Sequence, residues 1–246
     1  MSAIAGRAEG RAADALRPVT IEPGFMSTAT GSALISCGGT RVICTASIEQ
    51  GVPRWRAGKG LGWLTAEYGM LPASTGERKA RDAVRGRQDG RTIEIQRLIG
   101  RSLRGVVDDA ALGEFTINID CDVLEADGGT RCASITGAYV ALVLGCRRLV
   151  AEERIPALPL TGSVAAVSCG IVGTTALLDL DYREDSSAEV DANVVMTGDG
   201  GLLEVQATAE GTPLQRAHLD DLLVLAAHGI EGLRTAQEAA IASAGP

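Results

Sequence analysis

Residues 114–138 read EFTINIDCDVLEADGGTRCASITGA, and this stretch decides how the chain is expected to fold. Its first part alternates polar residues with apolar ones, as in a strand that buries one face: Phe115, Ile117, Ile119 and Cys121. Two glycines, a threonine and an arginine follow, and then a run of small and apolar residues that predicts a tightly packed, buried helix. The stretch therefore predicts a strand, a glycine-rich junction and a core helix in immediate succession.

The junction between strand and helix is a candidate anion site. A helix N-terminus exposes unpaired N–H groups and a partial positive charge, both of which favour phosphate. Gly128 and Gly129 would let the backbone come close to an anion, Thr130 adds a hydroxyl group, and Arg131 adds a planar fork of donors. The alternative is a glycine-rich turn with a threonine cap and a surface arginine, and the motif alone leaves both open.

The rest of the chain supplies elements of both kinds. Residues 33–47, 164–181 and 193–209 have the β-branched or leucine-rich arms and central glycines of β-hairpins. Helices are predicted at 91–108, at 132–153 and at 213–240, the last one broken near Gly229. Strands and helices do not alternate strictly, so we expect an α+β fold, a mixed α/β body in two layers.

The domain organisation is expected to be one catalytic unit over residues 1–246 with two lobes. The two prolines of residues 154–162 mark a seam, which places the lobes at about 15–154 and 160–242. The six cysteines form no C-x-x-C pair and lie in apolar segments, as buried thiols of a reducing compartment do. The polar N-terminus lacks the apolar segment of a signal peptide, so the expected location is the cytoplasm.

A basic stretch stands out in a chain whose formal net charge is -8. Nine of its 23 basic residues fall within residues 78–104, and eight of the nine are arginine: Arg78, Lys79, Arg81, Arg85, Arg87, Arg91, Arg97, Arg101 and Arg104. Such a run is often only a solvated helix face. A surface that follows a nucleic-acid backbone explains the local excess of arginine better.

An acidic segment at residues 179–193 is a candidate metal site. Asp179 and Asp181 follow a predicted hairpin arm and are expected to point to the same side of a strand end. Carboxylates of this kind bind Mg²⁺ or Mn²⁺ together with a substrate phosphate, although many acidic loops bind nothing. The two histidines lie in the C-terminal helical region, and the sequence shows no Walker P-loop and no dinucleotide-binding glycine motif.

The sequence resembles the ribonuclease PH family of phosphate-dependent 3′-exoribonucleases over most of its length. The matching stretches include LRPV (16–19), GWLTAEYGMLPAST (62–75), GRTIEIQRLIGRSLR (90–104), ADGGTRCASITGA (126–138) and DLDYREDSSAEVDANVVMTGDG (179–200). The resemblance implies a fold like domain 2 of ribosomal protein S5 and a hexameric ring built as a trimer of dimers. It also implies that inorganic phosphate, as co-substrate, removes 3′-terminal nucleotides from tRNA precursors and other RNA 3′ ends as nucleoside diphosphates, and that the reverse reaction adds nucleotides.

The resemblance also implies roles for individual residues. Phosphate would be held by Arg91, Gly129, Thr130 and Arg131. Asp179 and Asp185 would be catalytic and would bind Mg²⁺ or Mn²⁺, and tRNA would lie against Arg78, Lys79, Arg81, Arg85 and Arg87. Residues 21–39 depart from the family pattern, so the resemblance does not say how this segment contacts RNA or a neighbouring subunit.

Two other functions stay open at this point. A catalytically silent ring subunit would keep the basic stretch but lose the phosphate arginine or the aspartates, and this chain has all of them. A phosphorylase acting on a small nucleotide would leave the basic run without a role.

Overall fold

Two β-sheets form the framework of the protein. The computed structural model describes residue 7 and residues 10–245. The first sheet has the order β1-β2-β3-β5-β4, in which only the β4–β5 pair is parallel. Its strands are β1 (Val19–Pro23), β2 (Gly31–Cys37), β3 (Thr40–Gln50), β4 (Trp63–Met70) and β5 (Phe115–Glu125). The second sheet, β7-β6-β8-β9, is antiparallel throughout and consists of β6 (Val164–Val172), β7 (Thr175–Leu178), β8 (Val190–Thr197) and β9 (Leu202–Ala209).

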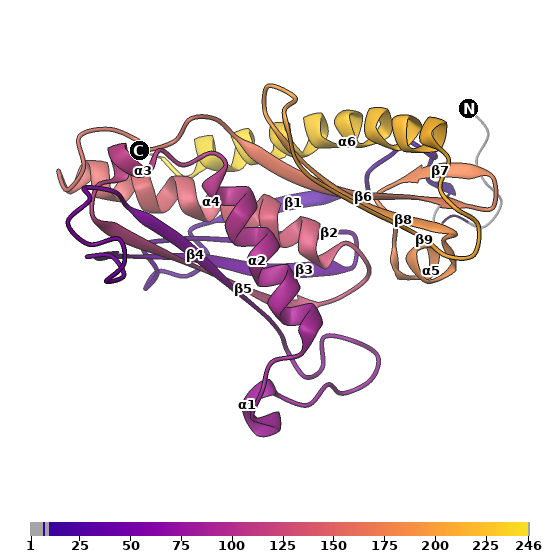
Figure 1. Cartoon of the computed structure of the whole chain (residues 1–246), viewed down its shortest axis with the longest axis horizontal. Helices are drawn as coiled ribbons and strands as arrows, with labels where there is room; N and C mark the ends of the chain where they lie inside the picture. The colour runs from indigo at the N-terminus through magenta and orange to yellow at the C-terminus, as the bar shows by residue number, and fades with distance from the viewer. Residues whose placement is uncertain (1–6, 8–9, 246) are drawn as a thin grey trace.

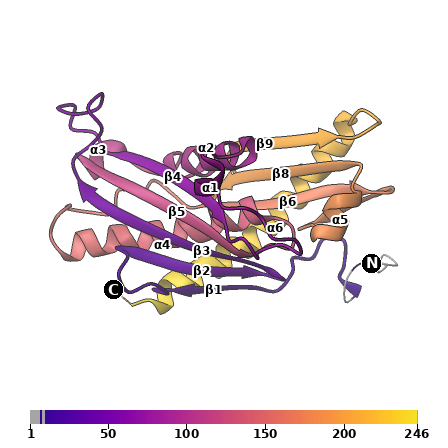
Figure 2. The same ribbon diagram turned by 90° about the horizontal axis from the view of Figure 1, so that it is seen from below.

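Two long helices join the sheets, as Figures 1 and 2 show. Helix α4 (Thr130–Ala151) packs on β2 and β3 and also contacts β6, while α6 (Arg216–Ser243) runs from β6 and β7 to β1. Helix α2 (Gly90–Arg104) lies against β4, and the short helices are α1 (Asp82–Arg85), α3 (Asp109–Leu112) and α5 (Tyr182–Ser187). The mixed α+β class expected from the sequence is confirmed.

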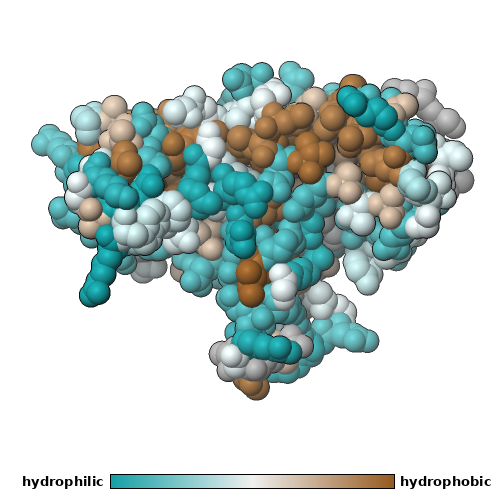
Figure 3. Space-filling view, in the orientation of Figure 1, coloured by the Kyte–Doolittle hydropathy of each residue, from teal (hydrophilic) through white to brown (hydrophobic). Residues whose placement is uncertain are grey.

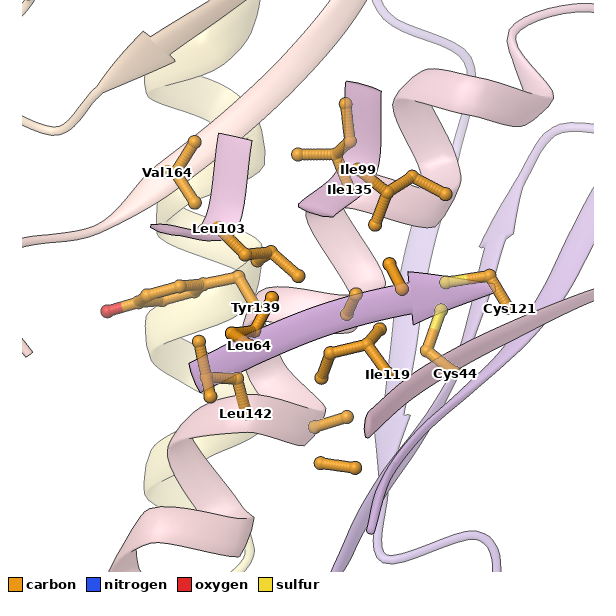
Figure 4. Packing of buried hydrophobic residues seen from close by; sticks show 14 of the residues in the cluster. Cys44, Leu64, Ile99, Leu103, Ile119, Cys121, Ile135, Tyr139, Leu142 and Val164 are labelled. Carbon is orange, nitrogen blue, oxygen red and sulfur yellow. The ribbon is translucent and has the colours of Figure 1, made fainter. Parts of the chain in front are cut away.

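The main core lies between the first sheet, α2 and α4. Figure 4 shows Leu64, Ile119 and Leu142 converging there from β4, β5 and α4, and none of the three is exposed to solvent. Leucine, isoleucine, valine and alanine build this core, and burying each larger side chain contributes about 1.5–3 kcal/mol. Helix α4 is the one described helix with the length and hydropathy of a membrane span, and 78% of that window is buried inside the protein.

The hairpins and the strand expected from the sequence are present, and the short helices α1, α3 and α5 are present although they were not expected. Strands β1 and β4, at the two edges of the first sheet, were not expected. The C-terminal helix is not broken at Gly229, because α6 continues through it to Ser243. A Cβ at Gly229 would lie 2.7 Å from the Leu178 side chain, so the glycine serves close packing of α6 on β7 and does not end the helix.

A long arm leaves the body between β4 and α2. Residues 71–89, which include α1, project away from both sheets in Figure 1. In Figure 3 the arm is mostly hydrophilic, whereas a band of hydrophobic residues crosses the body above it. The arm is therefore a solvent-facing extension whose base adjoins the start of α2.

Candidate functional site

The glycine-rich junction lies at the N-terminus of α4, and both glycines adopt left-handed backbone conformations, with φ of 77° at Gly128 and 66° at Gly129. A Cβ at Gly128 would lie 2.5 Å from the Leu180 carbonyl oxygen, in the acidic segment. The amide of Tyr182 also donates to Asp127 Oδ1 at 3.3 Å. The glycines therefore let the junction dock against the acidic segment, a role that the sequence did not reveal.

Thr130 and Arg131 open α4 and are held by different partners. The Thr130 hydroxyl lies 2.9 Å from the hydroxyl of Tyr68, which β4 presents. Arg131 donates to Gln206 Oε1 at 3.2 Å and lies 3.6 Å from Glu94 Oε2. Since Gln206 in turn donates to Glu94 at 3.0 Å, these three side chains from α4, β9 and α2 form a closed group.

Arg91 approaches the same place from the start of α2. Asp89 caps this helix, because its carboxylate accepts from the Thr92 amide at 2.7 Å, and Arg91 follows in the first turn. Within the described residues, the exposed Arg91 guanidinium forms no hydrogen bond or ion pair. The charges of Arg91 and Arg131 both act on the ionisation of Tyr68 and Asp191, so the two arginines converge on one region.

Asp179 occupies a different environment from the one that the sequence predicted. β7 ends at Leu178, and Asp179 takes a left-handed conformation with φ of 53° before Asp181 caps α5. Asp179 and Asp181 therefore do not share one side of a strand end, and that expectation was wrong. The buried Asp179 carboxylate accepts three hydrogen bonds from Arg17, at 2.7, 2.8 and 3.0 Å.

Asp185 instead lies beside Asp191, a residue of the candidate acidic segment to which the sequence gave no individual role. Asp185 sits in α5, whose start is fixed by a capping box between Asp181 and Glu184, and Asp191 follows the first residue of β8. Burial and then repulsion from Asp185, at hydrogen-bonding distance, raise the pKa of Asp191, while Arg131 and Arg91 oppose that rise. These two half-buried carboxylates therefore form a pair that faces both arginines.

The surface around this pair is hollowed. A pocket of about 460 Å³ is lined by residues that include Glu94, Arg131, Asp191, Asn193 and Gln206. It has room for an anion and a nucleotide end, and its polar lining comes from α2, α4, β8 and β9. The pocket thus brings Arg131, one of the phosphate-binding candidates, and Asp191 of the carboxylate pair to a single opening.

The carboxylate pair fits a divalent cation better than Asp179 does. Burial and the neighbouring Asp185 raise the pKa of Asp191 despite the charges of Arg131 and Arg91, so a cation between the two carboxylates would be favoured, whereas both Asp179 oxygens already accept hydrogen bonds from Arg17. In the described part of the chain, no group of three or more His, Cys, Asp or Glu side chains could hold a metal ion. Mg²⁺ commonly binds through one or two carboxylates and completes its shell with water and substrate phosphate.

The predicted RNA-binding residues lie on the arm. Arg78, Arg81 and Arg87 are exposed, and Lys79 is paired with Asp89 at 3.0 Å, while the Arg85 side chain lies outside the described part of the structure. The Asp89 carboxylate that Lys79 contacts also caps the helix carrying Arg91. The base of the arm is thereby linked to the start of α2.

Fold and site together define a two-sheet α+β protein in which a glycine-rich helix start, two arginines and a carboxylate pair lie in one region. Models of the 3′ exoribonuclease family match residues 15–145 with domain 1 (RNase_PH) and residues 162–229 with domain 2 (RNase_PH_C). The chain belongs to this family, which confirms the resemblance seen in the sequence.

Solved structures share the fold. One is described as the Archaeoglobus fulgidus exosome with RNA bound to the active site, with 23% identity and a TM-score of 0.79 over 93% of this chain and 91% of the other. Another is rice (Oryza sativa) Rrp46, with 16% identity and a TM-score of 0.78 over 96% and 100% of the two chains. At these identities the likeness bears on the fold alone.

Proposed function

We propose that this protein is a phosphate-dependent 3′-to-5′ exoribonuclease that shortens tRNA precursors and releases nucleoside diphosphates. The observation that carries the proposal is that Arg131 and Asp191 line one pocket, and that the charges of Arg131 and Arg91, from two different helices, both act on Asp191, which lies beside Asp185. Inorganic phosphate is the anion that this arrangement suits, because two guanidinium groups and a helix N-terminus supply donors and positive charge.

The reaction requires two anions to meet, and the arginines reduce their repulsion. Arg91 has no competing partner among the described residues, so its donors are available to phosphate or to the RNA diester. Arg131 is held by Gln206 and Glu94, which fixes its guanidinium before a ligand arrives. Such preorganised charge lowers the barrier to phosphoryl transfer, which depends mainly on positioning and electrostatics.

The bond changes balance without a covalent enzyme intermediate. An oxygen of inorganic phosphate attacks the phosphorus of the last diester, and the bond from that phosphorus to the 3′ oxygen of the preceding nucleotide breaks. The departing 3′ oxygen takes up a proton, and the terminal nucleotide leaves as a nucleoside 5′-diphosphate. Asp185 and Asp191 face this step, and the raised pKa of Asp191 suits it to hold a proton or share a cation.

A divalent cation completes the proposed site. Asp185 and Asp191 would hold Mg²⁺ or Mn²⁺, which stabilises negative charge developing on phosphate and leaving-group oxygens when bound. Asp191 takes the metal-binding role that the family resemblance implied for Asp179, because both carboxylate oxygens of Asp179 accept hydrogen bonds from Arg17. Asp185 remains in the proposal.

The basic arm bears on the proposed RNA substrate, and the exposed edge strand β9 bears on the proposed assembly. Arg78, Arg81 and Arg87 extend from the body on a projection suited to following a tRNA backbone. Strand β9 is an edge of the second sheet and exposes Leu202 and Val205, as surfaces that join subunits do. Two related structures are described as exosome complexes, and we propose a cytoplasmic homohexameric ring for this chain.

The test is to incubate the purified protein and Mg²⁺ with a tRNA carrying extra 3′ nucleotides, with and without inorganic phosphate. We expect phosphate-dependent shortening with release of nucleoside diphosphates. Arg91→Ala should lower kcat/KM by about 100-fold or more, because it removes a charge-stabilising donor. Arg216→Ala, which removes an exposed arginine of α6, is the control and should leave kcat/KM unchanged.

The same experiment separates an enzyme from a silent subunit. Tight RNA binding by the wild-type protein, with no phosphate-dependent product under any divalent cation, would identify an RNA-binding ring subunit and refute the proposed activity. Salt-insensitive turnover of a small nucleotide without tRNA binding would identify a nucleotide phosphorylase instead.

A further inference from the structure

One buried arginine reaches both halves of the site. Arg17 lies just before β1, at a position to which neither the reaction nor the sequence analysis assigns a role. On one side its Nε and one terminal nitrogen donate to the two Asp179 oxygens at 3.0 and 2.7 Å, in a two-pronged contact. On the other side its second terminal nitrogen donates to the backbone carbonyl of Asp127, at the glycine-rich junction.

The two segments that Arg17 joins carry opposite functions. Asp127 opens the junction that leads to Arg131 and the phosphate-binding end of α4. Asp179 opens the acidic segment that leads through α5 to Asp185. A single guanidinium therefore bridges the boundary between the proposed anion-binding part and the carboxylate part of the site.

Two further arginines fix the acidic side of this boundary. Arg7 donates to Glu184 Oε1 at 2.7 Å, and Arg11 donates to Glu184 Oε2 at 3.0 Å. Both also bond backbone carbonyls at the end of β7. Glu184 immediately precedes Asp185 and closes the α5 capping box, so these contacts fix the helical turn that presents Asp185.

We propose that Arg17 is a positioning residue that sets the placement of the phosphate-binding junction relative to the carboxylate pair. This inference rests on the proposed function for its catalytic consequence, although the joining of the two segments stands apart from it. Arg17 is buried and does not line the pocket that holds Arg131 and Asp191. It acts through the backbone of Asp127 and the carboxylate of Asp179.

Arginine is required here by geometry as well as by charge. The guanidinium plane offers three nitrogens in fixed directions, and all three are used, two toward Asp179 and one toward Asp127. Lysine keeps the charge but has one nitrogen, so it cannot reach both segments in this way. Replacing Arg17 with lysine would leave Arg91, Arg131, Asp185 and Asp191 in the chain. It would change only how the two arginines are placed relative to the two aspartates.

The kinetic test compares Arg17→Lys with Arg147→Lys. Arg147 also bonds backbone carbonyls from a partly buried position, those of Ile241 and Gly245, but it lies at the far end of α4. Well below the melting temperature, Arg17→Lys should lower kcat roughly 10–100-fold with little change in the KM for phosphate, because small misplacements of reacting groups have effects of this size. Arg147→Lys should keep both constants.

Hydrogen exchange supplies a measurement that does not depend on activity. In Arg17→Lys, residues 126–131 and 179–187 should lose amide protection together, while Arg147→Lys should leave both segments unchanged. If Arg17→Lys does not fold, Arg17→Gln replaces it, because a glutamine amide can donate to Asp179 but cannot also reach the Asp127 carbonyl, and both readings should shift in the same direction.

The outcomes separate the two proposals. A lower melting temperature with unchanged kcat in Arg17→Lys, or protection lost in only one of the two segments, would overturn the positioning role. If the wild-type protein shows no phosphate-dependent shortening, the proposed function fails, and the exchange data alone decide whether Arg17 joins the two segments.

Discussion

At the scale of single residues, two aspartates that look alike in the sequence have opposite roles. Asp179 is buried and receives every donor that Arg17 can direct at it, so its charge is compensated inside the protein. Asp191 is half-buried beside Asp185, and burial together with this neighbour raises its pKa although Arg131 and Arg91 act against the rise. Removing one partner of a buried ion pair leaves the other charge unpaired, which is destabilising. A carboxylate whose pKa is raised by burial and by a second carboxylate is instead a candidate ligand-binding group.

Removing the two charges should therefore produce opposite results. Asp179→Asn should lower the free energy of unfolding by about 3–5 kcal/mol, because it leaves Arg17 buried without its partner charge. Asp191→Asn should abolish phosphorolysis yet stabilise the protein at neutral pH in the absence of divalent cations. Urea unfolding and the tRNA-shortening assay measure these two effects.

The pH dependence of the Asp191→Asn effect has a definite sign. A raised folded-state pKa means that the folded protein favours the protonated form, so that contribution to stability is present in acid and is lost as pH rises through the raised pKa, above its ordinary value of about 3.9. The stability advantage of Asp191→Asn should therefore vanish in acid and grow toward neutral pH. An advantage that is constant with pH would contradict this account.

Of the Asp185–Asp191 pair, the sequence could assign a role to Asp185 and not to Asp191. Asp185 and the arginines stand in contiguous motifs, whereas the partner of Asp179 lies 162 positions away and no local pattern links the two. Asp191 carried one usable signal. It lies two residues before the predicted hairpin at 193–209 and six residues after Asp185, as a polar residue at the edge of an apolar segment.

At the scale of elements, close approach between backbones explains the glycine-rich junction. The strand and helix on either side were readable from alternation and from the run of small residues, and both are present as β5 and α4. What the sequence could not show is that the junction packs on the acidic segment of the other sheet. The same limitation explains Gly229, whose contact with Leu178 belongs to the packing of α6 on β7.

Gly128→Ala should be costly for this reason. The new methyl group would meet the Leu180 carbonyl at 2.5 Å, in a backbone with φ of 77°. We expect a loss of about 1–3 kcal/mol or more in the free energy of unfolding, together with lower kcat. Gly162→Ala is the matched control, since its Cβ would have no neighbour within 4 Å and should leave stability and kcat near wild type.

The edge strands show why two elements were not expected. β1 is a five-residue strand that ends in proline, and β4 is an edge strand that carries a glycine and two polar residues. Their stability comes from pairing with β2 and β5, and such pairing leaves little trace in a short segment read alone.

At the scale of the whole molecule, the arm concentrates positive charge on one projection of an acidic protein. Arg78→Ala combined with Arg81→Ala should weaken tRNA binding and reduce the slope of log K against log salt by up to about 0.9 for each lost phosphate contact. Filter binding over a series of salt concentrations measures both. The charge-matched pair Arg148→Ala and Arg216→Ala should leave the slope unchanged, and equal effects in the two variants would show that only net charge matters.

The cores of both sheets enclose every cysteine of the chain. Burial raises the pKa of Cys37, Cys146 and Cys169 to about 12 each, which disfavours their reactive thiolates. The folded protein should therefore resist maleimide labelling, and all six thiols should react after unfolding in urea. Rapid labelling of any thiol under native conditions, read by mass spectrometry, would show that its part of the core opens readily.

The contacts of Arg7 and Arg17 also have a consequence for the order of events during synthesis. Arg7 and Glu184 are 177 positions apart, so Arg7 is synthesised long before the residue with which it pairs. Such distant pairings close late, after local hairpins and helices have formed. A nascent chain that stalls before the acidic segment leaves Arg7 and Arg17 without their carboxylate partners, so this part of the site can be fixed only after that segment has been synthesised.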